Sequence, residues 1–297
     1  MVRDRSLGAK IFHICNYTFL ITLSILCVIP LIHVLAVSFS SSTEASAGSV
    51  LLWPVQFTTD AYQFVLNNPQ FFRSLGVTLE RVFLGTTINL FLITLLAYPL
   101  SKEKHEFPQR TIYVWILVFT MLFNGGLIPT FMVVRSTGII DTIWALVLPN
   151  AVPIFHVVLL LNFFRGIPKS LVEAALIDGA GHWTILFKIM LPLSIPVLAT
   201  LTLFSMVGHW NAWFDGMLYM NSPEDYPLQT YLRTIIIESD LSSLDTGVED
   251  QVKLLENVSE RTTRAAQIFL GALPILLVYP FLQKYFMKGI VMGSVKE

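Results

Sequence analysis

The sequence predicts an all-α membrane protein with six transmembrane helices, on the basis of three observations. The chain of 297 residues is 54% hydrophobic but only 13% charged, whereas a soluble domain carries about 25% charged residues. Its mean hydropathy is +0.67. Six long windows contain no Asp, Glu, Lys or Arg, and a helix of about 20 apolar residues crosses a hydrocarbon core. We therefore expect lipid to be the main solvent of this chain.

The expected spans follow these windows in order along the chain. They cover residues of about 12–37, 77–100, 111–133, 142–163, 192–215 and 265–284. Their internal Pro and Gly residues are tolerated because neighbouring helices can satisfy the freed backbone groups. Arg3, Arg5 and Lys10 precede the first window, as in a signal peptide, but the apolar core of a signal peptide has only about 7–15 residues. We expect an uncleaved first span and one transmembrane domain over residues 1–297.

The segments between the spans predict the orientation. With the N-terminus inside, residues 101–110, 164–191 and both tails share one side and hold most of the 19 lysines and arginines. The other side is acidic, mainly in residues 215–264. Since Lys and Arg retain loops in the cytoplasm, we expect both termini and residues 164–191 there. The outer loop 38–76 carries aromatic residues and is expected to pack a short helix or two near the membrane surface.

Residues 164–191 carry a spaced motif, formed by Glu173-Ala174-Ala175, Gly179, Ile189 and Leu191-Pro192. Ser170 followed by Glu173 fits a capping box and predicts a short helix over 171–178. Glycines at 179 and 181 should end it, because glycine readily adopts positive φ. A second helical stretch is expected from about residue 182. From periodicity alone, the first helix could equally lie flat on the membrane as an amphipathic helix.

The motif resembles the cytoplasmic EAA loop of permease subunits from bacterial ABC importers. That resemblance implies a coupling helix that sits in a cleft of a separate ATPase and moves with it. The residues expected to couple to the ATPase are Leu171, Glu173, Ala174, Ala175, Ile177, Asp178 and Gly179.

Three further stretches extend the resemblance to the carbohydrate-uptake, MalG-like branch and, more narrowly, to permeases of the LplC/YtcP type. They are residues 123–130, 208–214 and 279–289. The resemblance implies a bacterial inner-membrane protein that works with an ABC ATPase dimer, a second related permease and an extracytoplasmic solute-binding protein. It also implies that the tail after Lys288 reaches the ATPase; a frayed, lipid-anchored terminus is the alternative.

Missing motifs exclude several function classes. The chain contains no Gly-Lys pair, so it has no Walker A loop, and we expect ATP and Mg²⁺ on the partner ATPase. We find no charged residue well inside a span, which argues against a secondary carrier with an ion relay. His33 and His156 remain, and we expect each to hydrogen-bond a neighbouring helix.

Catalytic and metal sites are not expected, because the chain lacks a Gly-x-Ser-x-Gly elbow and a His-Glu-x-x-His pair. The net charge of −1 argues against binding nucleic acid. A membrane scaffold or sensor and a secondary carrier remain as alternative functions.

The substrate pathway is expected near the outer end of the fifth span. Aromatic platforms beside a few polar groups suit sugars, and an interfacial aromatic belt is the alternative. Asn124 begins an Asn-Gly-Gly stretch in the third span that either unwinds to line a cavity or packs helices closely. The residues expected in the pathway are Asn124, His209, Trp210, Asn211, Trp213 and Asp215. The resemblance is compatible with an acidic oligosaccharide, such as a pectin or alginate fragment.

Overall fold

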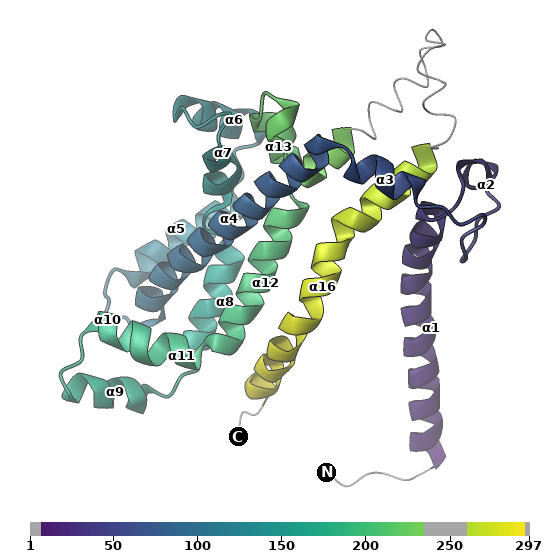
Figure 1. Ribbon diagram of the computed structural model, residues 1–297. Helices are drawn as coiled ribbons and strands as arrows, with labels where there is room; N and C mark the ends of the chain where they lie inside the picture. The colour runs from purple at the N-terminus through teal and green to yellow at the C-terminus, as the bar shows by residue number, and fades with distance from the viewer. Residues whose placement is uncertain (1–6, 235–259, 295–297) are drawn as a thin grey trace. The chain divides into compact units, whose positions relative to one another are not determined.

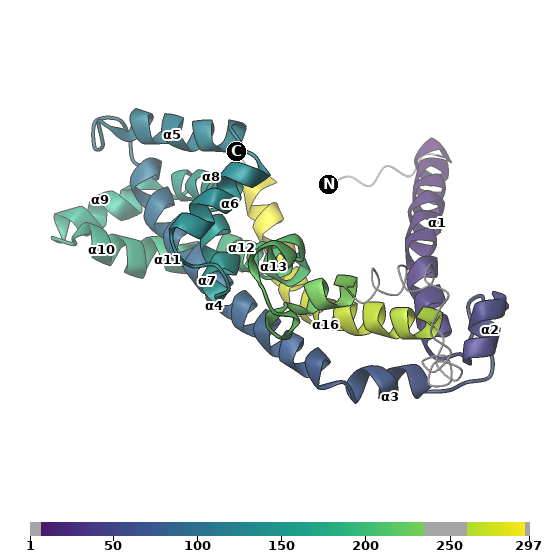
Figure 2. The same ribbon diagram turned by 90° about the horizontal axis from the view of Figure 1, so that it is seen from above.

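The computed structural model describes residues 7–234 and 260–294, and this part of the chain is mostly helical and contains no strand. The predicted all-α class is therefore confirmed for the described residues. The chain divides into two compact units. One comprises residues 1–69 and 234–273, the other residues 70–233 and 274–297, and Figures 1 and 2 show their helices. The single membrane domain over residues 1–297 stays a prediction.

The first unit contains α1 (Leu7–Ser38), α2 (Ser42–Ala47), α3 (Asp60–Leu66) and the start of α16 (Glu260–Ser294). The helices α2 and α3 are the short helices expected in the outer loop. Phe39 stacks on Tyr62, with ring centroids 4.6 Å apart, and the Tyr62 hydroxyl lies 2.8 Å from Ser38 Oγ. The chain that follows α1 is therefore held against the end of that helix.

The second unit contains ten of the labelled α-helices, besides a helical stretch over residues 228–233 and the end of α16. They are α4 (Pro69–Ser101), α5 (Arg110–Leu122), α6 (Leu127–Ser136), α7 (Ile143–Val147), α8 (Ile154–Arg165), α9 (Lys169–Ile177), α10 (His182–Ile185), α11 (Leu191–Leu193), α12 (Ile195–Asn211) and α13 (Phe214–Tyr219). Their main core joins α4, α8, α10 and α12 (Figure 1). Its fully buried members are Ile93, Ala97, Leu160, Ile185 and Leu201.

Among the described residues, α1 and α4 are each long and apolar enough to cross a membrane, and three bent helix pairs bring the number to as many as five spans. The predicted sixth span, 265–284, falls inside α16, and some of its side chains lie outside the described part. The count of six spans therefore stays a prediction.

Three of the predicted spans are bent or broken in the structure. The third span, predicted over 111–133, is broken between α5 and α6 with a bend of 118°, because Gly126 adopts φ +88° and the helical hydrogen bonds stop there. The fourth span, predicted over 142–163, bends by 50° next to Pro153, which has no N–H to donate.

The fifth span is also shorter than predicted. We expected residues 192–215, but α12 runs from Ile195 to Asn211, and it is bent by 81° from the helical stretch His182–Leu193. A π-helical turn over Leu186–Met190 joins α10 to α11. Pro192 lacks the N–H that an uninterrupted helix would use.

Candidate functional site

The helix α9 lies in the segment that carries the spaced motif, and its start differs from the prediction. Pro168 occupies the N-cap, and no side-chain cap hydrogen bond is described at this end. Ser170 and Glu173 therefore lie inside the helix instead of forming a capping box, which corrects that prediction. Proline at the end of the preceding loop sets the chain direction instead, because its ring fixes φ.

The end of α9 is a Schellman motif, in which two backbone N–H groups close the helix. Gly179 N–H donates to the Leu176 carbonyl at 3.0 Å, and Ala180 N–H donates to the Ala175 carbonyl at 2.9 Å. Gly179 has φ +78°, as predicted for a glycine that ends a helix. Gly181 has φ −76°, so the prediction that it also needs positive φ is wrong.

The two faces of α9 have different surroundings. Val172 and Ala175 pack against the main core. On the other face, Ile177 is 86% exposed and Leu171 is 44% exposed, and Glu173, Ala174 and Asp178 are also exposed. An apolar side chain that exposed is suited to contact another molecule.

The stretch after α9 is anchored in the second unit. Ile185, Leu186 and Met190 are buried in the main core. The Tyr98 hydroxyl of α4 lies 3.1 Å from His182 Nδ1. The exposed helix α9 is thus attached on its C-terminal side to a segment that packs tightly on α4 and α8.

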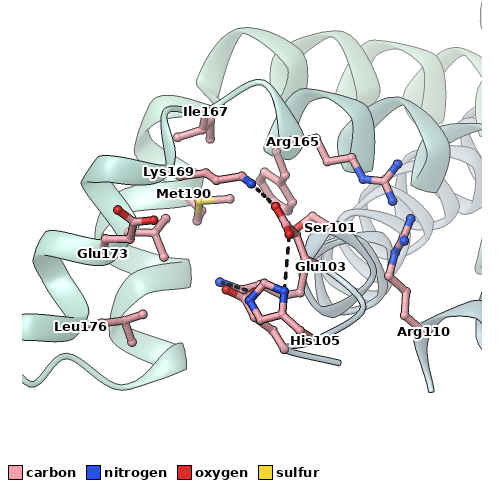
Figure 3. A pocket seen from close by; sticks show the side chains of 14 residues that line it. Ser101, Glu103, His105, Arg110, Arg165, Ile167, Lys169, Glu173, Leu176 and Met190 are labelled. Atoms are coloured by element: carbon pink, nitrogen blue, oxygen red, sulfur yellow. Dashed lines mark hydrogen bonds and ion pairs between the residues drawn. The ribbon is translucent and has the colours of Figure 1, made fainter. Parts of the chain in front are cut away.

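A cavity of about 460 Å³ lies beside α9, and we call it the α9 cavity (Figure 3). Its lining comes from the end of α4, the following loop, the end of α8 and α9, with the residues Ser101, Lys102, Glu103, His105, Glu106, Arg110, Phe164, Arg165, Ile167, Lys169, Val172, Glu173, Leu176 and Met190. Lys169 forms an ion pair with Glu103, and His105 Nδ1 lies 3.4 Å from the same carboxylate. The loop after α4 is therefore tied to the first turn of α9.

The end of α4 is held by two arginines. Arg110 Nε donates to the Leu100 carbonyl at 2.8 Å, and Arg165 Nη2 donates to the same oxygen at 3.3 Å. The last carbonyls of a helix lack partners within the helix and attract cations. One backbone oxygen thus joins the end of α4 to the start of α5 and the end of α8.

A second cavity, of about 370 Å³, lies at α13 and is called the α13 cavity. It is lined by Asn124, Gly126, Leu127, Thr130, Ala145, Pro149, Asn150, Phe214, Asp215, Leu218 and Tyr219. Two residues expected in the pathway, Asn124 and Asp215, are therefore brought together. Asn124 Oδ1 accepts the Gly126 N–H at 2.9 Å, so the structure supports the alternative in which this stretch unwinds and lines a cavity.

The other four residues expected in the pathway lie outside the α13 cavity. His209 is buried against Gly85, where an added Cβ would come within 2.4 Å of His209 Nε2. Trp210 lines an apolar crevice, and Asn211 is exposed. The Arg233 guanidinium lies 4.7 Å from the Trp213 ring centroid.

The most important residue that sequence reasoning missed is Arg81. It is 1% exposed and forms a two-pronged ion pair with Asp215. Its guanidinium also donates to the Leu146 carbonyl at 3.3 Å and to the Ala212 carbonyl at 3.2 Å. Because α4 begins at Pro69 and not at 77, Arg81 lies inside the helix but directly before its charge-free window 82–101, so the expectation of spans without internal charge stays a prediction. Its position beside a charge-free window was the available signal.

Three more polar residues of the α13 cavity were missed, namely Thr130, Asn150 and Tyr219. They stand in different segments of the sequence, and only the bends bring them together. Burial and, second, the Asp215 carboxylate raise the pKa of Tyr219, so this residue stays a neutral phenol.

Both histidines left as candidates have close polar neighbours. His33 Nδ1 lies 2.7 Å from the Leu51 carbonyl, which belongs to a loop and not to a helix as expected. His156 Nδ1 lies 3.5 Å from Ser205 Oγ of the neighbouring helix α12. Neither arrangement resembles a chain of proton carriers.

Comparison with protein families gives a match over residues 75–291 to the model described as "Binding-protein-dependent transport system inner membrane component". Among curated proteins, the chain is similar to the polygalacturonan/rhamnogalacturonan transport system permease protein YtcP of Bacillus subtilis (strain 168). The two are 41% identical over 97% of this chain and 99% of that protein.

Protein LplC of the same organism is 40% identical over 97% of this chain and 96% of its own length. Among solved structures, a bacterial ABC transporter involved in the import of the acidic polysaccharide alginate contains a chain that matches with a TM-score of 0.86 and 34% identity. The match covers 96% of this chain and all of that one.

Proposed function

We infer the function from the premise that this chain belongs to the family of binding-protein-dependent transport system inner membrane components. It is a permease subunit of an ABC importer for oligosaccharides, and such a subunit is a membrane component and not an enzyme. The resemblance to LplC and YtcP expected from the sequence is confirmed.

We propose that the imported substrate is an acidic oligosaccharide from a pectin-like or alginate-like polysaccharide. The observation that carries this proposal is the 41% identity, over nearly the whole of both chains, to a permease for polygalacturonan and rhamnogalacturonan. The structural relative serves alginate. Polygalacturonan and alginate are both built from uronic acids, so the two relatives share a substrate chemistry.

The importer is proposed to contain an ATPase dimer that holds ATP and Mg²⁺, a second related permease and an extracytoplasmic binding protein. We place both termini and α9 in the cytoplasm, on the side favoured by lysine and arginine. The tail after residue 288 is proposed to reach toward the ATPase. Its side chains are outside the described part of the chain.

The helix α9 is proposed to dock on the ATPase through its exposed face, which carries Leu171, Glu173, Ala174, Ile177, Asp178 and Gly179. Ala175, the seventh residue expected to couple, packs against the main core. The exposure of Ile177 supports this role. Motion of α9 would pass to α4 through the Lys169–Glu103 ion pair and the Tyr98–His182 contact. It would pass to α8 through the shared core.

The α13 cavity is proposed to form part of the sugar pathway. Amide and hydroxyl groups of Asn124, Thr130 and Asn150 lie with the Phe214 ring on its lining. Sugar sites combine such polar groups with an apolar platform. His209, Trp210, Asn211 and Trp213 remain proposed only as supports outside this cavity.

The test is ATP-dependent uptake of an oligogalacturonide by the complete importer in proteoliposomes. Glu173→Lys should abolish uptake while the complex still inserts into the membrane, because the added positive charge stands on the docking face. Ser170→Ala is the matched control on the same helix and should keep uptake near the wild-type rate. Uptake that continues without ATP would favour a secondary carrier, and purification without any ATPase would favour a scaffold or sensor.

A further inference from the structure

The acidic residues between positions 212 and 233 share one arrangement: each is paired with an arginine of α4. Asp215 pairs with Arg81. Glu224 Oε2 lies 2.7 Å from Arg73 Nη1, and Asp225 Oδ1 lies 3.5 Å from Arg73 Nη2. The sequence predicted an acidic outer side, yet in this stretch each of the three carboxylates contacts an arginine, and Arg73 is shared by two of them.

The two arginines have different surroundings. Arg73 is 53% exposed, and an exposed pair is screened by water and contributes little. Arg81 is 1% exposed, and its partner Asp215 is 16% exposed. Water screens the Arg81–Asp215 pair much less. The net charge of this pair therefore sets the electrostatic potential around it.

Asp215 lies on the α13 cavity, and it is the one acidic or basic residue among the described lining residues. The other polar lining groups are amides, hydroxyls and the neutral phenol of Tyr219. Without Arg81, this cavity would carry one uncompensated negative charge. A carboxylate there would repel a passing uronate, because a cleft with low-dielectric walls focuses the field of its charges.

We propose that Arg81 is a specificity-determining residue, which cancels the charge of Asp215 and so lets an anionic oligosaccharide enter the α13 cavity. This inference rests on the proposed function, since it assumes a uronate substrate. Arg81 acts on the α13 cavity through its partner Asp215, which lies on the lining. It also fixes the ends of α7 and α12 through the Leu146 and Ala212 carbonyls. Its role in charge must therefore be separated from its role in packing.

The experiment compares two substrates of equal length, a trigalacturonide and its methyl ester, which lacks the negative charges. Initial uptake of each by the complete importer in proteoliposomes gives a ratio of acid to ester. Differences in the amount of inserted complex cancel in this ratio. The binding protein is the same throughout, so its own preference cancels when each variant is compared with wild type.

Arg81→Gln should lower the ratio by about tenfold, as expected for one unscreened charge near the substrate. The double variant Arg81→Gln/Asp215→Asn should return the ratio to near the wild-type value, because the charge is again balanced. Asp215→Asn alone should raise the ratio, and this variant keeps the test open if Arg81→Gln does not assemble.

Equal loss of both substrates in Arg81→Gln, or a ratio that the double variant does not restore, would show that Arg81 acts only in packing and would overturn the inference. A wild-type importer that takes up neither oligosaccharide with ATP would instead contradict the proposed function, and this inference with it.

Discussion

Gly179 and Gly181 stand two positions apart but differ in backbone conformation. Gly179 has φ +78° in the Schellman motif, whereas Gly181 has φ −76°. A Cβ at either position would meet no atom within 4 Å. Backbone conformation alone therefore decides which of the two glycines can be replaced.

Gly179→Ala should destabilise the end of α9 by about 1–2 kcal/mol, the cost of a left-handed conformation for a residue with a Cβ. Gly181→Ala is the matched control and should change the unfolding free energy by less than about 0.5 kcal/mol. Thermal unfolding of the purified importer measures the first effect, and ATP-dependent uptake should fall with it. Equal stability of the two variants would contradict the role given to Gly179.

At the scale of elements, α9 has a packed face and an exposed face, and two neighbouring alanines differ in which face they belong to. Ala175 packs against the main core, while Ala174 is exposed. Both belong to the same motif, and both were expected to couple to the ATPase. The structure divides these roles, because consecutive side chains on a helix point in directions about 100° apart.

Ala175→Leu should destabilise the permease by about 1–3 kcal/mol, because extra methylene groups in a packed site force neighbours to move. Ala174→Leu should leave the thermal stability of the permease unchanged but reduce the amount of ATPase that copurifies with it. Thermal stability and ATPase copurification are measured on both variants, and each variant should change only one of the two. Loss of ATPase from Ala175→Leu alone would reverse the assignment of the two faces.

The sequence predicted the helical class, because charge-free windows record which residues avoid water. It left the break at Asn124 open as one of two alternatives and did not locate the other two bends, since a proline such as Pro153 is tolerated both in straight and in broken spans. The capping box was wrong because Pro168 competes for the same helix start. Arg81 was missed since its charge is cancelled by Asp215, a partner far away in the sequence.

At the scale of the whole molecule, the orientation in the membrane remains a prediction. It follows from the distribution of Lys and Arg and places α9 and the outer loop 38–76 on opposite sides. Each side offers a well-exposed reporter position: Ile177 is 86% exposed and Trp53 is 82% exposed.

In a variant without the two native cysteines, Ile177→Cys should react with a membrane-impermeant maleimide only after the cells are opened. Trp53→Cys should react in cells whose cytoplasmic membrane is intact. Labelling of both in intact cells, or the reverse pattern, would contradict the orientation. Gel shifts with a maleimide-polyethylene glycol reagent give the measurement directly.

The joint at the end of α4 depends on a backbone oxygen, that of Leu100, which both Arg110 and Arg165 contact. Every amino acid supplies that oxygen, so no substitution at position 100 can delete it. In a saturation mutagenesis library, position 100 should therefore accept any apolar side chain that fills the same space. Loss-of-function substitutions should concentrate instead at Arg110 and Arg165. Neither lysine nor glutamine reproduces the guanidinium geometry at these positions.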